Sequence, residues 1–196
     1  RGGPGFYEHY NTSMLVSNNK PPQFVHKSKL VLGVEKVPFS NWFPSLEELS
    51  VNNGGTSGTL GIEKEAKVIR SGGFTFAPVV CYESLYGGFI AEQCRKGAEI
   101  IFVITNDGWW GDSPGHKQHA SFARLRAVET GKYLVRSANT GISSVINQRG
   151  DVVKSTPYWI EDAFKSTVHL NDEPTFYVKY GDVIGRFFGF VFFLLL

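Results

Sequence analysis

The sequence predicts an α/β fold built around a mixed sheet. Three apolar, partly β-branched segments have the composition of buried strands, and they occupy residues 74–80, 100–105 and 133–137. Helices are expected at 85–96 and 116–130, between these strands. Strands that alternate with helices indicate parallel pairing, with the helices covering the sheet.

Shorter elements are expected on both sides of this core. Before it, the patterns predict strands at 13–16, 24–32 and 63–70, at most a short helix at 46–51, and a flexible glycine-rich stretch at 52–61. After it, they predict a strand at 142–147, a hairpin turn at 148–151 with a return strand from Val152, a last strand at 163–170 and a linker at 171–182. The hairpin is what makes the expected sheet mixed.

The C-terminal segment is wholly apolar from Phe187 to Leu196. A bilayer span needs about 20 apolar residues, and this run is about half that length. Because the run has no polar face, we expect residues 183–196 to begin a transmembrane helix, with Arg186 at the membrane interface. The alternative is a short hydrophobic helix packed on the domain. Residues 1–182 would form that domain, and the chain would be a fragment of a longer membrane protein.

Composition argues against several classes of protein. Lys and Arg together number 20 and Asp and Glu 18, so the sequence offers no strong case for a nucleic-acid partner. The two cysteines, Cys81 and Cys94, do not make a disulfide framework. His116 and His119 share one predicted helix, but further ligands at suitable spacing are lacking, so neither a metal nor another cofactor is expected.

Cys81 lies where the strand at 74–80 ends and polar residues begin. A cysteine between a strand and a helix N-terminus is in a position that favours a thiolate, and hence a nucleophile. A buried structural cysteine explains the local pattern equally well, because free cysteine is among the most buried residue types. If Cys81 is the nucleophile, the backbone N–H of Tyr82 is placed to bind an oxyanion, and Glu83 could orient neighbouring groups.

Two further regions carry candidate residues. Lys27 or Lys29 could stabilise an oxyanion if buried beside a carboxylate, although the local pattern favours a solvated lysine pair. The loop at 105–115 follows a buried strand, at the edge where α/β folds place their sites. Its candidate substrate-binding residues are Asn106, Asp107, Trp109 and Trp110, and Trp42 is a further candidate wall. On the helix that follows, Arg126 and Glu129 are expected to pair on a solvated face.

The order and spacing of these motifs resemble the nitrilase, or carbon–nitrogen hydrolase, superfamily. The shared motifs are Lys27-x-x-Leu30, Glu35 after a glycine, Cys81-Tyr82-Glu83, and Asn106-Asp107-x-Trp109. More narrowly, the chain resembles the apolipoprotein N-acyltransferase family through the segments 27–35, 105–111, 118–129, 136–142, 148–150 and 180–182. The resemblance covers about residues 10–196.

The resemblance implies a fold and a set of site residues. The fold would be a partial α-β-β-α sandwich over residues 1–182, followed by the start of a transmembrane helix. Cys81 would be the nucleophile, Lys27 rather than Lys29 the lysine of a Glu-Lys-Cys triad, and Glu35 a supporting glutamate. Tyr82 and Glu83 match residues beside the family's cysteine. No matching general-base glutamate precedes Lys27, so this fragment alone would be inactive. Leu32 stands where the family usually has proline.

The resemblance also implies an activity. A fatty acyl chain would move from a phospholipid to the N-terminal amine of a diacylglyceryl-cysteine apolipoprotein, through a thioester on Cys81. The enzyme would act as a monomer without a cofactor in the bacterial inner membrane, with its catalytic domain on the periplasmic side. The alternative is a soluble amidase that hydrolyses a C–N bond with the same triad. A catalytically dead, membrane-anchored binding domain is a third reading.

Overall fold

The computed structural model describes residues 8–36 and 60–195. The chain divides into two compact units, residues 1–65 and residues 66–196, called here the N-terminal and the C-terminal unit and described separately. The expected helix at 46–51, most of the glycine-rich stretch at 52–61, and Trp42 lie outside the described residues.

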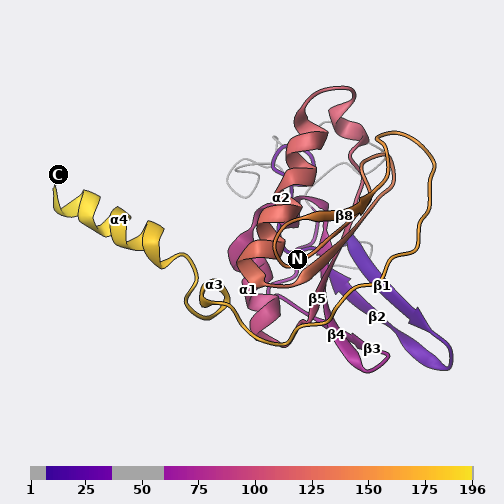
Figure 1. The fold of residues 1–196 in the computed structure, drawn as a ribbon, viewed down its shortest axis with the longest axis horizontal. Coiled ribbons are helices and arrows are strands. Elements are labelled where there is room, and N and C mark those ends of the chain that lie inside the picture. The colour runs from indigo at the N-terminus through magenta and orange to yellow at the C-terminus, as the bar shows by residue number, and fades with distance from the viewer. Residues whose placement is uncertain (1–7, 37–59, 196) are drawn as a thin grey trace. The chain divides into compact units, whose positions relative to one another are not determined.

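The described part of the N-terminal unit contains an antiparallel hairpin of β1 (Thr12–Ser17) and β2 (Lys20–His26) (Figure 1). Asn19 takes a left-handed φ of 59° in the turn, a conformation that asparagine tolerates better than most residues. The second strand was expected at 24–32, but it begins at Lys20 and ends at His26. Its two adjacent prolines lie opposite an irregularity in the pairing with β1, between Leu15 and Ser17, a position at which strands tolerate residues without an N–H.

The C-terminal unit is built on a six-stranded mixed sheet with the order β3-β4-β5-β6-β7-β8. Its strands are β3 (Ile69–Ser71), β4 (Phe74–Val80), β5 (Ile100–Thr105), β6 (Tyr133–Ala138), β7 (Ser144–Ile146) and β8 (Val152–Ser155). The pairs β4–β5 and β5–β6 are parallel, and the other neighbours are antiparallel. The predicted mixed sheet is therefore confirmed, although the strand expected at 63–70 is reduced to the three residues of β3.

Two helices, α1 (Gly87–Arg95) and α2 (Gly115–Thr130), pack on this sheet. Ile90 and Ala91 of α1 and Ala127 of α2 share the apolar core with strand residues such as Ile101 and Leu134. Each fully buried leucine or isoleucine side chain of this core contributes about 1.5–3 kcal/mol. The helix expected at 85–96 is α1, which starts two residues later because Leu85 still belongs to a 3-10 turn, η2 (Cys81–Leu85).

The buried face of α2 is unusually polar. It presents His116, His119, Arg126 and Thr130 to the interior, together with two alanines. Arg126 pairs with Glu129 at 3.2 Å as expected, but the prediction of a solvated face is wrong, because the Arg126 side chain is only 6% exposed. The apolar residues Phe122, Leu125 and Val128 lie on the exposed side instead. Polar contacts, rather than apolar periodicity, therefore orient this helix.

The C-terminal segments differ from the prediction in two places. Residues 163–170 form no strand, although Phe164 lies 5.0 Å under the Lys154 ammonium and His169 packs near Tyr133. Alternating residues become a strand only where a partner supplies the ladder, and this segment has none in the part of the chain described. The linker expected at 171–182 contains a short helix, α3 (Phe176–Tyr180).

The apolar tail forms α4 (Val183–Leu194), whose first turn is capped by the Asp182 carboxylate accepting from Gly185 N at 2.8 Å. Its phenylalanines, including Phe187, Phe188 and Phe193, are exposed. Within residues 8–36 and 60–195, no helix combines the length and the apolar character that crossing a bilayer requires.

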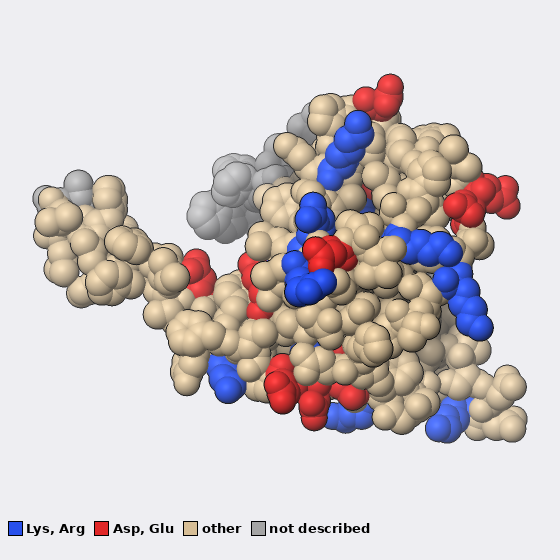
Figure 2. Space-filling view, in the orientation of Figure 1, with Lys and Arg blue, Asp and Glu red and all other residues tan. Residues whose placement is uncertain are grey.

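Charged side chains are interspersed on the face shown in Figure 2, with basic and acidic groups close to one another. No extended basic surface is visible there, in keeping with the formal net charge of +2.

Candidate active site

Cys81 stands immediately after β4, at the first position of η2. Its φ is +52°, in the left-handed region that non-glycine residues seldom adopt. Such a conformation costs about 1–3 kcal/mol and persists only where its surroundings impose it. Cys81 is half-buried, and it and Cys94 are both free thiols. The chain therefore holds one partly accessible cysteine in a strained turn at the carboxyl end of a buried parallel strand.

The turn that follows is held partly by its own residues. The Glu83 carboxylate, 2% exposed, accepts a hydrogen bond from Val80 N at 2.8 Å. This bond closes the junction between β4 and η2. Tyr82, half-buried, places its ring edge-on to that of Tyr86 with the centroids 5.4 Å apart. Glu83 thus shapes the cysteine turn from inside the unit.

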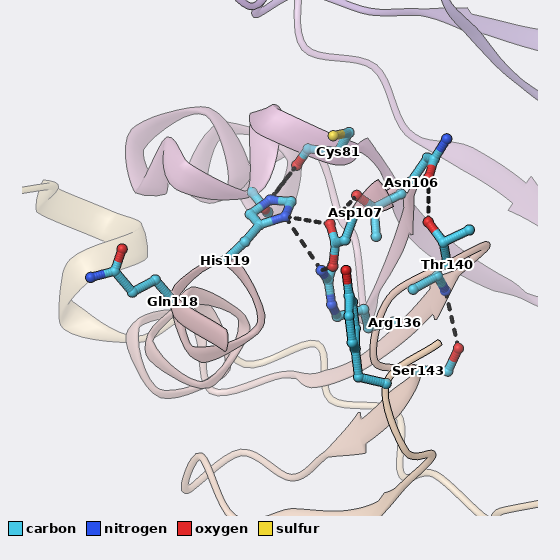
Figure 3. Close-up of polar contacts among 12 residues, drawn as sticks. Cys81, Asn106, Asp107, Gln118, His119, Arg136, Thr140 and Ser143 are labelled. Carbon is cyan, nitrogen blue, oxygen red and sulfur yellow. Dashed lines mark hydrogen bonds and ion pairs between the residues drawn. The ribbon is translucent and has the colours of Figure 1, made fainter. Parts of the chain in front are cut away.

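A chain of buried polar side chains lies behind Cys81 (Figure 3). The Ser84 hydroxyl donates to the Cys81 carbonyl oxygen at 2.8 Å and lies 3.0 Å from Nε2 of His119. The same Nε2 atom lies 3.3 Å from the Cys81 carbonyl oxygen, so His119 contacts the backbone of the cysteine rather than its sulfur. The histidine reaches this place from α2, and the serine from η2.

Asp107 joins His119 to the sheet. One of its carboxylate oxygens lies 2.9 Å from His119 Nδ1 and accepts from Thr105 Oγ1 at 3.1 Å. The other forms an ion pair with Arg136, which comes from β6, one of the two central strands. Burial alone would raise the pKa of Asp107, but the hydrogen bond from His119 and the charge of Arg136 outweigh it and lower the pKa below its ordinary value. Asp107 is therefore a buried carboxylate whose charge is compensated on both sides.

The rest of the loop after β5 is exposed. Asn106 Oδ1 accepts from Gly108 N at 3.1 Å and from Thr140 Oγ1 at 2.6 Å, which ties this loop to the turn after β6. Trp109 and Trp110 lie in a 3-10 turn, η3 (Gly108–Trp110), and are 54% and 47% exposed. Of the four expected substrate-binding residues, both tryptophans and Asn106 therefore face outward, whereas Asp107 points into the unit.

The remaining residues of the expected site, Lys27 and Glu35, lie in the N-terminal unit. Lys27 is 1% exposed, and its Nζ atom donates to both carboxylate oxygens of Glu35, at 2.8 and 2.7 Å. Glu35 also accepts from Asn11 Nδ2 and from Val31 N, each at 2.8 Å. Lys27, which matches the Lys-x-x-Leu spacing, is the buried lysine, and Lys29 is half-exposed. Four hydrogen bonds thus fix the Glu35 carboxylate against the lysine.

Three members of the Cys81 surroundings were given no role on the basis of sequence: Ser84, His119 and Arg136. His119 and Arg136 fell within matched motifs, but motif membership did not say what they contact. One signal was present, because an arginine within an apolar strand has to find a carboxylate if it is buried.

His116, three residues before His119, is buried too but stacks on Tyr158 with the ring centroids 3.7 Å apart. Among the described residues, no group of three or more His, Cys, Asp or Glu side chains could hold a metal ion.

Comparison with known proteins places this arrangement in a family. The carbon–nitrogen hydrolase family model matches residues 2–173, and the chain belongs to that family. Among curated proteins, it is 36% identical over 187 residues to the apolipoprotein N-acyltransferase of Chlorobaculum tepidum, covering 91% of this chain and 34% of that protein. It is 42% identical over 106 residues to the enzyme of the same name from Bradyrhizobium diazoefficiens, covering 54% of this chain and 20% of that one. The chain thus spans only part of the relatives it matches.

Solved structures agree on the fold. Saccharomyces cerevisiae Nit3, a member of the nitrilase superfamily, superposes with a TM-score of 0.54 at 19% identity, over 78% of this chain and 51% of that one. The glutamine-dependent NAD+ synthetase of Acinetobacter baumannii gives 0.59 at 14% identity, over 78% and 27% of the two chains. At such identities the likeness concerns architecture only, and it confirms a nitrilase-like α/β fold.

Proposed function

We propose that this chain is part of the catalytic domain of an apolipoprotein N-acyltransferase. The observation that carries the proposal is the strained, half-buried Cys81 at the end of a parallel strand, in a chain similar to curated enzymes of that name. Such a cysteine suits nucleophilic catalysis, in which one difficult acyl transfer is divided into two easier steps.

In the first step, a base removes the Cys81 proton and the thiolate attacks the sn-1 ester carbonyl of a phospholipid. A C–S bond forms, the ester C–O bond breaks, and the released alkoxide takes up a proton as the lysophospholipid leaves. In the second step, the free amine of a diacylglyceryl-cysteine apolipoprotein attacks the thioester. A C–N bond forms, the C–S bond breaks, the amine loses a proton, and Cys81 is regenerated.

Both steps develop negative charge on a carbonyl oxygen. We propose that Lys27 and the backbone N–H of Tyr82 stabilise it, since preorganised donors in a dry site are worth far more than the same donors in water. An ammonium has three N–H donors, so binding Glu35 with two of them still permits a bond to a substrate oxygen. Glu35 would hold the Lys27 ammonium in position through two hydrogen bonds, and Glu83 would hold the cysteine turn.

The proposed general base is a glutamate supplied from outside these 196 residues. The acidic side chains among the expected site residues, Glu35, Glu83 and Asp107, are engaged in the contacts described above. We therefore expect these 196 residues to form no thioester by themselves.

The expected substrates are lipids, so we further propose that α4 is the start of a membrane-spanning segment and that the domain works at the periplasmic side of a bacterial inner membrane. The exposed phenylalanines of α4 support this proposal.

A soluble amidase is the second candidate, because the carbon–nitrogen hydrolase family and the same residues would serve it with water as the second nucleophile. The apolar exposed α4 favours the lipid enzyme.

The test uses the full-length protein, phosphatidylethanolamine with a labelled acyl chain, and a diacylglyceryl peptide. The wild type should gain the mass of one acyl chain on Cys81 and pass it to the peptide, Cys81→Ala should do neither, and Cys94→Ala should behave as the wild type. Acyl transfer that survives Cys81→Ala would refute the nucleophile assignment. Hydrolysis of simple amides without transfer from the lipid would favour the amidase.

A further inference from the structure

The Cys81 carbonyl oxygen is held from behind by two side chains. Ser84 Oγ lies 2.8 Å from this oxygen, and His119 Nε2 lies 3.3 Å from it. A carbonyl oxygen has two lone pairs and can accept both contacts. This carbonyl belongs to the residue whose φ is +52°, so both contacts act on the strained peptide of the cysteine.

Both ring nitrogens of His119 lie in polar contacts. Nδ1 lies 2.9 Å from the Asp107 carboxylate and 3.3 Å from Nη2 of Arg136. Nε2 lies 3.3 Å from the Cys81 carbonyl oxygen and 3.0 Å from Ser84 Oγ, whose hydroxyl donates to the same carbonyl. The imidazole ring therefore connects the Asp107–Arg136 pair on one side with the Cys81 backbone on the other.

The far end of this chain of contacts is rigid. Asp107 is 0% exposed and Arg136 is 1% exposed, and the two form an ion pair between the end of β5 and the middle of β6. Adjacent parallel strands fix the relative position of these two residues, since Val103 of β5 pairs with Arg136 itself. A displacement of the Cys81 carbonyl would therefore have to move a ring held by the sheet.

We propose that Ser84, His119, Asp107 and Arg136 form a positioning network for the nucleophile: they hold the Cys81 carbonyl and so impose the left-handed backbone that directs the sulfur and the Tyr82 N–H at one substrate carbon. The sulfur is two bonds from the Cys81 Cα, and the Tyr82 N–H belongs to the same peptide unit as the held carbonyl. A rotation about the Cys81 N–Cα bond, which is the φ angle, would move both groups together. The inference rests on Cys81 being the nucleophile of the proposed function.

The test measures acylation of Cys81 in the full-length protein by p-nitrophenyl acetate, which is too small to need the lipid-binding surfaces. The burst of nitrophenol gives the acylation rate. The variants are His119→Ala, His119→Gln and Asp107→Asn, and the matched control is His116→Ala, a buried histidine on the same helix that contacts Tyr158 instead. Thermal midpoints are recorded for each variant, and rates are compared where all are folded.

His119→Ala and Asp107→Asn should slow the burst about 100-fold, the order expected when a reacting group is misplaced by about 1 Å, with little change in the KM for the ester. His119→Gln should recover part of the loss, because its amide N–H can reach the Cys81 carbonyl. His116→Ala should retain the wild-type rate. A His119→Ala rate equal to that of His116→Ala, or no advantage of Gln over Ala, would overturn the inference.

The same assay separates this inference from the proposed function. If Cys81→Ala keeps the burst, the nucleophile assignment fails and the inference fails with it. If the burst depends on Cys81 and His119 but phospholipid never acylates the protein, the lipid substrate is wrong and the positioning network stands.

Discussion

The ammonium of Lys27 donates to both carboxylate oxygens of Glu35, at 2.8 and 2.7 Å, in a pair whose lysine is 1% exposed. A buried ion pair is costly to form, and removing one partner leaves the other charge without compensation. The pair thus fixes which of two nearby lysines is directed inward.

Lys27→Ala should therefore destabilise the protein by about 3 kcal/mol, the lower end for a broken buried pair, because Glu35 keeps its bonds from Asn11 and Val31. Lys29→Ala, at a half-exposed position, should cost about 1 kcal/mol or less. Acyl transfer should fall sharply in the first variant and change little in the second. Urea unfolding and the transfer assay check these expectations, and an equal or larger loss from Lys29→Ala would contradict them.

The φ of +52° at Cys81 predicts an unusual order of stability for two substitutions at this position. Glycine adopts this conformation freely, whereas alanine keeps the strain of a Cβ atom, so Cys81→Gly should be more stable than Cys81→Ala by about 1 kcal/mol. Chemical unfolding of both variants measures the difference. The opposite order, which is usual away from left-handed positions, would show that the turn is not strained.

Gly141 lies against the Asp107 carboxylate, and a Cβ at this position would overlap that carboxylate and lie 2.9 Å from the Cβ of Ala138. Gly141→Ala should displace Asp107, cost about 1–3 kcal/mol and reduce acylation of Cys81. Gly88→Ala is the control, because a Cβ there meets nothing within 4 Å on helix α1 and should stabilise by about 0.5–1 kcal/mol. Equal behaviour of the two variants in the burst assay would count against coupling between Asp107 and Cys81.

The lowered pKa of Asp107 predicts how stability depends on pH. The charged form of Asp107 is favoured in the folded state. Its contribution to the free energy of unfolding is therefore fully present above the unfolded pKa of about 3.9, and it is lost as the pH falls through the lower pKa of the folded state. The free-energy difference between the wild type and Asp107→Asn should therefore be constant near neutral pH and shrink in acid. Asp112→Asn, at an exposed position in the same loop, should leave the curve unchanged. If the difference in free energy of unfolding between the wild type and Asp107→Asn grew as the pH fell, the prediction would be contradicted.

Burial raises the pKa of the Cys94 thiol to about 11, while Lys132 and Arg95 act weakly in the opposite direction. At pH 8, iodoacetamide should therefore leave Cys94 unmodified in the folded protein and modify it in urea, as peptide mass spectrometry would show. The stability that this thiol contributes is present below its unfolded pKa of about 8.5 and is lost as pH rises through 11. Rapid labelling of Cys94 without denaturant would disprove this.

The local sequence pattern was sufficient to predict the central strands and the helix α2. The strands at 74–80 and 100–105 have the predicted bounds, and α2 differs by one residue at its start. These segments are buried, so their own composition, together with the flanking residues that end strands and helices, is enough to predict them. The 163–170 segment was also expected to be a strand but forms none, because pairing depends on a partner that its own residues do not specify.

By itself, the sequence determined the order of the αβ elements, the place of Cys81 at a strand end, and the spacing that selects Lys27. These follow from local periodicity and from motifs read along the chain. Only the tertiary structure decided the left-handed backbone of Cys81 and the contacts that run from Ser84 through His119 and Asp107 to Arg136. The physical reason is distance along the chain: a hydrogen bond between residues such as Asp107 and Arg136, 29 positions apart, depends on how two strands pair, and no local pattern encodes that.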